Sequence, residues 1–436
     1  MHILPTLTQI FNAFSGQEIS YCHWKSNEHL DAALLGKTDL DILVDPGQIA
    51  YVRDILRAHG CKRLHSRRDT LHPEREDWIG MDEETGAQFH FDLHTGIVIG
   101  PRAIKIYDVP IVQWLLRDTV LVEHVQTAAP NKELVMLVMR ALLKESLSAD
   151  IRHELDWLLS QTDVVGAVEA CGDMNCGVPV NIVSQFLERY TQGQSVYHDL
   201  RKELHRALGR YRCRSIYAEY SIRLMQVIRA KLHIRRVRYH KIPGTLLAIV
   251  GADGSGKTTA SKKILDWLGW KVSVRHIYFG LPREAMMVRV CVKLRTTIGG
   301  SFFDSCYWLA VAWVRYRKYR FARSLVSQGY IVIAERYPLK EFWNMTQPMD
   351  GPRIPLSRRI ASRIERWLYT NIHRPNHLIV LHTPLGVLKE RKSEKRIEEK
   401  ASAVDALDGD GVSIFSTDRP AEETMQEVKR CVWNKI

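Results

Sequence analysis

The sequence lacks any apolar run long enough to cross a membrane. Its longest apolar and aromatic stretch spans Tyr307–Val314, far short of the roughly 20 residues that a membrane-spanning helix needs. Residues 1–17 lack the basic, apolar and small-residue regions of a secretory signal. We therefore expect neither membrane insertion nor secretion, and we expect a cytoplasmic protein.

Cysteine is scarce and scattered. The chain has eight cysteines among 436 residues, and the nearest pair, Cys171 and Cys176, has no second pair close by in the sequence. A structural zinc site usually takes its four ligands from two such pairs. The pattern excludes a site of this kind and favours eight reduced thiols, as in a cytoplasmic protein. The sequence also lacks internal repeats and low-complexity tracts.

Acidic residues are outnumbered, but the imbalance is local. The net charge is +13, and the segment 201–243 alone holds 13 Lys and Arg against two Glu. Apolar residues recur in this segment at helical spacing: Ile216, Tyr220, Leu224, Val227, Ile228 and Leu232. We predict a basic amphipathic helix. It is either an interdomain helix with one packed face or a surface that binds anionic lipid or nucleic acid.

The length and the order of patterns predict three segments. Residues 1–125 mix expected strands with helices, the strands at 21–24, 40–44, 78–81 and 88–93 and a helix at 48–58. Residues 126–243 are expected to form a helical connector. From 244 to 436, strands and helices alternate, which predicts a parallel sheet in an α/β domain.

Residues 251–258 read GADGSGKT and fit the phosphate-binding pattern G-x-x-x-x-G-K-[ST]. The apolar run 245–250 before it predicts a buried strand, and 259–269 predicts a helix. A strand, loop and helix in this order bring backbone N–H groups and a helix N-terminus to a polyphosphate. We therefore predict ATP as ligand, with Lys257 at the β- and γ-phosphates and the Thr258 hydroxyl on Mg²⁺. The predicted nucleotide-binding residues are Gly251, Asp253, Gly254, Ser255, Gly256, Lys257, Thr258 and Thr259.

A second cluster, Glu335-Arg336-Tyr337, follows the expected strand 329–334. An acidic residue at the carboxyl end of a parallel strand faces the same crevice as the phosphate loop. Glu335 is therefore predicted to hold the Mg²⁺ site or to accept the proton of an attacking oxygen. Arg336 is predicted to hold an acceptor phosphate and to offset charge in the transition state.

With these two motifs, the segment 244–436 resembles the thymidylate kinase family of P-loop kinases, whose pattern is a P-loop containing Asp-Gly and a later Asp-Arg-Tyr. The resemblance implies a parallel sheet with helices on both faces. A helix over 314–329 leads without a gap into Glu335-Arg336-Tyr337. The resemblance therefore implies that Arg315, Arg336 and Tyr337 contact the acceptor.

The run 388–396 resembles the mobile lid of the same family. The resemblance implies that Arg391 and Arg396 close over the phosphates, so that Arg391 joins Lys257, Glu335 and Arg336 as a catalytic residue. A solvated charged helix explains this run equally well.

Two features depart from the family. Glu335 stands where the family has Asp, and the family's Arg-Glu-Pro-Gly-Gly segment is replaced by the sequence RHIYFGLPR at 275–283. An additional loop at 348–353 follows the Glu-Arg-Tyr cluster. We therefore expect phosphoryl transfer to a small-molecule, sugar or nucleotide acceptor other than dTMP. The resemblance to diverged kinase-like domains of bacterial surface-polysaccharide gene clusters also admits a lipid-linked acceptor.

Near the N-terminus, Asp39 and Asp41 lie two residues apart on an expected strand, so both side chains face one side and can share a divalent metal. Asp92 lies on another expected strand. With Ser26 upstream, this pattern resembles the nucleotidyltransferase superfamily, in which D-x-D and a later Asp bind two Mg²⁺. Three converging carboxylates without metal would repel one another, so we expect the pKa of at least one to be raised.

Three histidines surround this predicted site: His72, His90 and His94. His90, Asp92 and His94 alternate along one expected strand, so they face one side together. They are either metal ligands or a base, or they form the polar outer face of a half-buried strand. We prefer the second interpretation.

Together the patterns predict an ATP- and Mg²⁺-dependent phosphotransferase fused to an α+β nucleotidyltransferase-like domain. Two alternatives stay open. The N-terminal domain performs the chemistry and the P-loop domain regulates it, or the chain is a nucleotide-gated interaction module. A lid and an acceptor arginine favour the kinase, since a switch needs neither.

Overall fold

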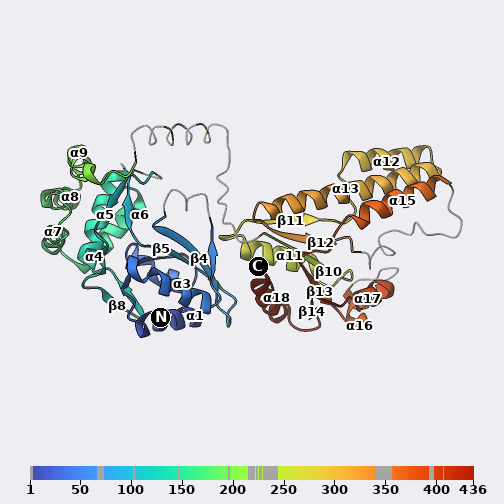
Figure 1. Cartoon of the computed structure of the whole chain (residues 1–436), viewed down its shortest axis with the longest axis horizontal. Coiled ribbons are helices and arrows are strands. Elements are labelled where there is room, and N and C mark those ends of the chain that lie inside the picture. Colours follow the sequence, from blue (N-terminus) through green and yellow to red (C-terminus); the bar gives the residue numbers. More distant parts are fainter. Residues whose placement is uncertain are drawn as a thin grey trace. The chain divides into compact units, whose positions relative to one another are not determined.

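The computed structural model describes residues 3–65, 73–101, 104–144, 147–194, 197–214, 221, 224, 228, 244–339, 356–391, 397–405 and 407–436. The chain forms two compact units, Met1–Val237 and Arg238–Ile436 (Figure 1). Within the described ranges, no helix combines the length and the apolar character that crossing a bilayer requires.

The first unit is built on a mixed seven-stranded sheet with the order β3-β4-β5-β2-β1-β9-β8. Its strands are β1 (Tyr21–His23), β2 (Asp39–Val44), β3 (Lys62–Leu64), β4 (Arg75–Met81), β5 (Gln88–His94), β8 (Val120–Val122) and β9 (Val125–Thr127). A separate hairpin joins β6 (Ile97–Ile99) to β7 (Tyr107–Val109). The central strands β2 and β5 are parallel, whereas β4 and β1 run antiparallel to their neighbours β5 and β2.

The sheet separates two hydrophobic cores because side chains alternate along a strand. On β2, Leu40 and Ile42 enter one core, and Leu43 enters the other. The first core is closed by α1 (Pro5–Gly16), α2 (Leu30–Leu34) and α3 (Ile49–Ala58). Asp39 and Asp41 therefore lie on the same face as Leu43, toward the second core.

The second core contains the helices that follow the sheet. They are α4 (Val112–Leu116), α5 (Pro130–Lys144), α6 (Ala149–Gln161), α7 (Val164–Asp173), α8 (Val180–Thr191) and α9 (His198–Ala207). Short 3-10 turns lie at η1 (Asn27–His29), η2 (Pro46–Gln48) and η3 (Leu208–Tyr211). Leu137 and Val138 of α5 are buried in one cluster with Cys22 and Leu43 of the sheet. Residues 130–211 therefore share a core with the sheet of the first 127 residues.

The second unit has a five-stranded, fully parallel sheet with the order β11-β12-β10-β13-β14. Its strands are β10 (Thr245–Gly251), β11 (Val274–Tyr278), β12 (Ile331–Glu335), β13 (His377–His382) and β14 (Val412–Ser416). Its helices are α11 (Lys257–Leu268), α12 (Met286–Thr297), α13 (Ser301–Ser327), α15 (Leu356–Thr370), α16 (Leu385–Arg391), α17 (Ile397–Asp405) and α18 (Ala421–Lys435). This α/β architecture is consistent with a P-loop kinase-like fold.

The expected strands of the first unit are confirmed as β1, β2, β4 and β5, and the expected helix at 48–58 is α3. One interpretation was wrong. β5 is not half-buried, because all seven of its residues are buried. Its polar side chains lie between the sheet and a second packed layer. Most of the predicted basic amphipathic helix lies outside the described residues, as do His72, Arg396 and the loop at 348–353.

The shared core predicts that a mutation in α5 destabilises the whole first unit. We expect Leu137→Ala to lower the free energy of unfolding by about 2–5 kcal/mol, because it removes buried methyl groups and leaves a cavity. Urea denaturation followed by circular dichroism measures this. The matched control is Leu121→Ala, since Leu121 is 61% exposed. A loss below about 0.5 kcal/mol, as expected at the surface, would show that α5 is not part of this core.

Candidate functional site

The phosphate-binding loop of the second unit runs from the end of β10 to the start of α11. Gly251 ends the strand, and a Cβ at this position would lie 2.6 Å from the Leu381 carbonyl oxygen of β13. Gly256 precedes the helix with φ of 85°, in the left-handed region that favours glycine. Both positions therefore need glycine, and the tight loop brings its backbone N–H groups to the N-terminus of α11.

Ser255 and Lys257 of this loop are buried donors. The Ser255 hydroxyl is buried and has no hydrogen-bond partner among the residues that the structure describes. The Lys257 ammonium donates a hydrogen bond of 2.5 Å to the Ala252 carbonyl and lies 3.8 Å from an Asp253 carboxylate oxygen. A buried hydroxyl without a partner is costly unless a ligand satisfies it. The loop thus holds donors that suit an anion. Thr259, also predicted to bind the nucleotide, is exposed in the first turn of α11.

The loop meets the Glu335 carboxylate at the end of β12. The Thr258 hydroxyl donates a hydrogen bond of 2.7 Å to one Glu335 oxygen, and His276 Nε2 lies 3.4 Å from the other. Burial alone would raise the pKa of Glu335, but the hydrogen bonds from His276 and Thr258 outweigh it, so the pKa lies below its usual value. Glu335 is therefore an anion at neutral pH.

Arg336 extends the same cluster. Its backbone φ is 55°, in the left-handed region, and its Nη2 donates a hydrogen bond of 2.6 Å to Asp253. Asp253 thus holds Arg336 and also lies beside Lys257. The structure therefore brings the phosphate-binding loop together with two predicted residues at the end of β12, Glu335 and Arg336.

The other two predicted acceptor residues are engaged inside the protein. Arg315 is buried and donates hydrogen bonds of 2.9 Å to the Phe279 carbonyl and to the Tyr369 hydroxyl. The Tyr337 hydroxyl donates a hydrogen bond of 2.6 Å to the His373 carbonyl. Both side chains therefore hold neighbouring segments in place. Arg391 is the last residue of α16, and its side chain lies outside the described residues.

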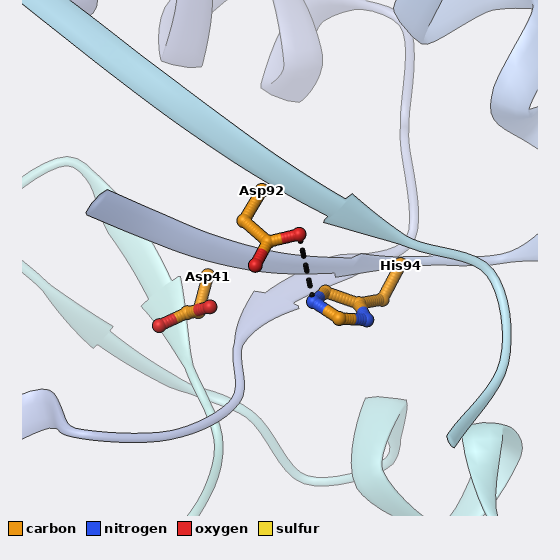
Figure 2. A group of neighbouring side chains, drawn as sticks. All are labelled: Asp41, Asp92 and His94. Carbon is orange, nitrogen blue, oxygen red and sulfur yellow. Dashed lines mark ion pairs between the residues drawn. The ribbon is translucent and has the colours of Figure 1, made fainter. Parts of the chain in front are cut away.

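The first unit contains a separate polar cluster on the sheet. Asp41 of β2 lies directly opposite Asp92 of β5 in the parallel pairing. One ligand atom from each of Asp41, Asp92 and His94 lies within 4.8 Å of the others, and His94 Nε2 is 3.1 Å from an Asp92 oxygen (Figure 2). The group therefore offers two oxygens and one nitrogen to a metal ion.

Asp39 does not belong to this group. Its carboxylate lies 3.2 Å from His90 Nδ1, and His90 Nε2 lies 3.2 Å from Asp77 on β4. Asp77 was not predicted from the sequence, because only the pairing of β4 with β5 places it opposite Asp92. The predicted triad of Asp39, Asp41 and Asp92 is thus divided between two neighbouring groups of side chains.

Cations accompany these carboxylates. The Lys25 ammonium lies 2.7 Å from Asp41, and Arg75 donates a hydrogen bond to Asp92 and lies 3.1 Å from Asp77. Burial alone would raise the pKa of Asp92, but His94, Lys25 and Arg75 together hold it well below its usual value. The pKa of Asp92 is therefore not raised, because three neighbouring basic side chains accompany its carboxylate.

Sequence reasoning also missed the roles of Lys105 and Lys25 in this region. Burial lowers the pKa of Lys105 to about 7, and the charges of Lys25 and Arg140 act in the same direction. Lys105 precedes the hairpin strand β7, and no local pattern marks it. Ser26 donates a hydrogen bond of 3.5 Å to Glu154. Lys25, not Ser26, is the residue of this segment that contacts Asp41.

Comparisons with known proteins give distant similarities. No family model matches the sequence. The chain is 25% identical over 232 residues to YghS, an uncharacterized ATP-binding protein of Escherichia coli K12, a match that covers 44% of this chain and 93% of YghS. It is 25% identical over 224 residues to YghR of the same strain, described in the same words, with coverage of 44% and 87%.

Two solved structures are also similar in part. Thymidylate kinase from Ehrlichia chaffeensis matches with a TM-score of 0.31 and 15% identity, over 44% of this chain and 99% of that one. Thymidylate kinase from Candida albicans matches with a TM-score of 0.32 and 17% identity, over 44% of this chain and 90% of that one.

Proposed function

We propose that the second unit transfers a phosphoryl group from ATP to an acceptor, with Mg²⁺ as cofactor. The contact between Thr258 and Glu335 carries this proposal, because it joins the phosphate-binding loop to an anionic side chain on the neighbouring strand. The description of YghS and YghR as ATP-binding proteins supports the choice of nucleotide. In this proposal, Lys257 and the unpartnered Ser255 hydroxyl hold the triphosphate.

The residues present fit a magnesium ion. The Thr258 hydroxyl and the Glu335 carboxylate are adjacent oxygen donors, which Mg²⁺ prefers. They would hold the ion, and when bound it would neutralise charge on the phosphate oxygens. His276 contacts the second Glu335 oxygen and thereby orients the carboxylate.

The chemistry asked of the chain is positioning and charge stabilisation. The acceptor oxygen forms a bond to the γ-phosphorus, the bond to the β–γ bridging oxygen breaks, and its electron pair leaves with ADP. Lys257 and Arg336 are proposed to offset the charge on the transferring group, with Arg391 added when the lid closes. Glu335, whose pKa is lowered, is proposed to accept the proton that the acceptor oxygen loses. Arg315 and Tyr337 are proposed to act on the acceptor indirectly, because they position the segments around Phe279 and His373.

Lys257, the lysine of the phosphate-binding loop, tests this proposal. We expect Lys257→Ala to lower ATP-dependent phosphoryl transfer or ATP hydrolysis at least about 100-fold, because it removes a charge that acts on the transferring group. Release of ADP measures it. Lys262→Ala is the matched control, since Lys262 is an exposed lysine on the same helix. Unchanged activity in Lys257→Ala, with an unchanged circular dichroism spectrum, would refute the kinase assignment.

The acceptor is proposed to be a small molecule, sugar or nucleotide other than dTMP. Residues 275–283 stand in place of the segment that frames the thymidine phosphate in the thymidylate kinase family, and the Phe279 carbonyl accepts a hydrogen bond from Arg315. This arrangement leaves the acceptor side without that frame.

We therefore expect dTMP to be a poor acceptor, with kcat/KM below about 10⁴ M⁻¹s⁻¹. A coupled assay of ADP release with dTMP measures this, and a true thymidylate kinase assayed in parallel shows that the assay works. Turnover of dTMP at or above that value would show that the acceptor is dTMP after all.

A second activity is proposed for the first unit because Asp41, Asp92 and His94 converge on one point. Two carboxylates and an imidazole fit one divalent ion. Lys25 and Arg75 now pair with the two carboxylates, so the ion would compete with them for these oxygens. A metal there would support nucleotidyl transfer. In the alternative, this unit performs the chemistry and the P-loop unit regulates it, or the chain acts as a nucleotide-gated interaction module.

Asp41 tests this site. We expect Mg²⁺ or Mn²⁺ to stabilise the wild-type protein, by about 2.7 kcal/mol when the ion is at 100 times its Kd. Asp41→Asn should remove most of this gain and leave Lys257-dependent transfer unchanged. Thermal unfolding with and without metal measures it. Asp54→Asn, at an exposed carboxylate of the same unit, is the control. Equal metal stabilisation of wild type and Asp41→Asn would exclude this site.

A further inference from the structure

Helix α12 of the second unit leaves most of its apolar side chains in water. The exposed apolar residues of this helix and the turn after it are Met286, Met287, Val290, Val292, Leu294 and Ile298. Met286, Val290, Leu294 and Ile298 recur every four residues, so they form one stripe along the helix. Met286 is 75% exposed and Ile298 is 63% exposed. Val288 is the only residue of α12 that is fully buried.

The two helices beside α12 extend this apolar surface. α13 packs against both α12 and α15, and the three helices form one layer (Figure 1). On α15, Ile360, Ile364 and Trp367 are exposed at helical spacing, and on α13 Phe302 and Trp313 are exposed. We call this surface the α12–α13–α15 face. Exposed apolar surface of this extent on one layer indicates an interaction site.

The charge of the face has one sign. The sequences of the three helices contain only two carboxylates, Asp304 and Glu365. Asp304 lies 2.5 Å from Arg295, and Glu365 is buried. Arg289 and Lys293 of α12 are exposed beside the stripe, and neither has a carboxylate partner in the part of the chain that the structure describes. Further exposed arginines of these helices are Arg317, Arg320 and Arg323 of α13 and Arg359, Arg363 and Arg366 of α15.

We propose that the α12–α13–α15 face docks on an anionic lipid bilayer. The α12 stripe would lie at the boundary between headgroups and acyl chains, and Arg289 and Lys293 would contact lipid phosphates. An aliphatic stripe gains free energy when it enters hydrocarbon. Nucleic acid instead rewards aromatic stacking, and the α12 stripe contributes nothing to it, because the exposed aromatic residues of the face lie on α13 and α15. The absence of unpaired carboxylates on the three helices favours an anionic partner. This proposal does not depend on the phosphotransferase activity.

Vesicle binding tests the proposal with the full-length protein. Vesicles of phosphatidylcholine with 30% phosphatidylglycerol should bind it. Vesicles of phosphatidylcholine alone should bind it at least about tenfold more weakly, because the choline cation cancels the phosphate charge and leaves the surface without a net negative charge. The triple variant Met286→Gln, Val290→Gln and Leu294→Gln should lower the partition coefficient at least about tenfold. Glutamine keeps the helix propensity, so the helix should persist.

The matched control replaces three exposed apolar residues of the first unit: Tyr51→Gln, Leu121→Gln and Val165→Gln, at 59%, 61% and 62% exposure. It should bind vesicles like the wild type. A double variant, Arg289→Gln and Lys293→Gln, should weaken binding to the anionic vesicles and leave weak binding to neutral ones unchanged.

Three results would overturn the proposal. The wild type fails to prefer anionic vesicles, or the α12 triple variant binds them as well as the wild type does. In the third, the wild type binds no vesicles but forms a dimer, or binds an acidic protein or nucleic acid, and the triple variant loses that binding. Sedimentation of the protein with and without vesicles distinguishes these outcomes.

Discussion

The in-register parallel pairing of β10 with β12 positions the groups of the site in the second unit. Ile249 lies opposite Glu335, and the chain then leaves the sheet through the loop and returns as α11, so that Thr258 comes to 2.7 Å from the carboxylate. β11 pairs with the other side of β12, which brings His276 to the second oxygen. A register shift of one residue would turn the Glu335 side chain to the opposite face of the sheet and separate these groups.

Burial of charge shapes the first unit in a different way. Its sheet is covered on both faces, so the acidic residues on β2, β4 and β5 are largely removed from water. A buried carboxylate is tolerated only when it is paired or hydrogen-bonded. Lys25 and Arg75 supply the pairing for Asp41 and Asp92. A metal ion at this point would therefore have to displace cations that already stabilise the fold, unlike a metal bound by three bare carboxylates.

The cations of the phosphate-binding site and those of α12 have different surroundings. In the site, Lys257 and Arg336 share the Asp253 carboxylate, which holds both side chains beside the loop. On α12, Arg289 and Lys293 extend into solvent beside an apolar stripe. The first arrangement fixes geometry for a small ligand. The second leaves long side chains free to reach a broad anionic surface, for which flexibility costs little.

The sequence by itself determined the features that are contiguous along the chain. The phosphate-binding loop was predicted because eight consecutive residues carry its glycines, Lys257 and Thr258, and the central strands were predicted from alternating or continuous apolar residues. The pairs His276–Glu335, Lys25–Asp41 and Arg75–Asp92 could not be predicted, and neither could the place of Asp77. Each joins different segments of the chain, and only the strand order and register decide which residues meet. The same reason explains why Arg315 and Tyr337, whose sequence positions fit an acceptor role, are engaged with neighbouring segments inside the protein.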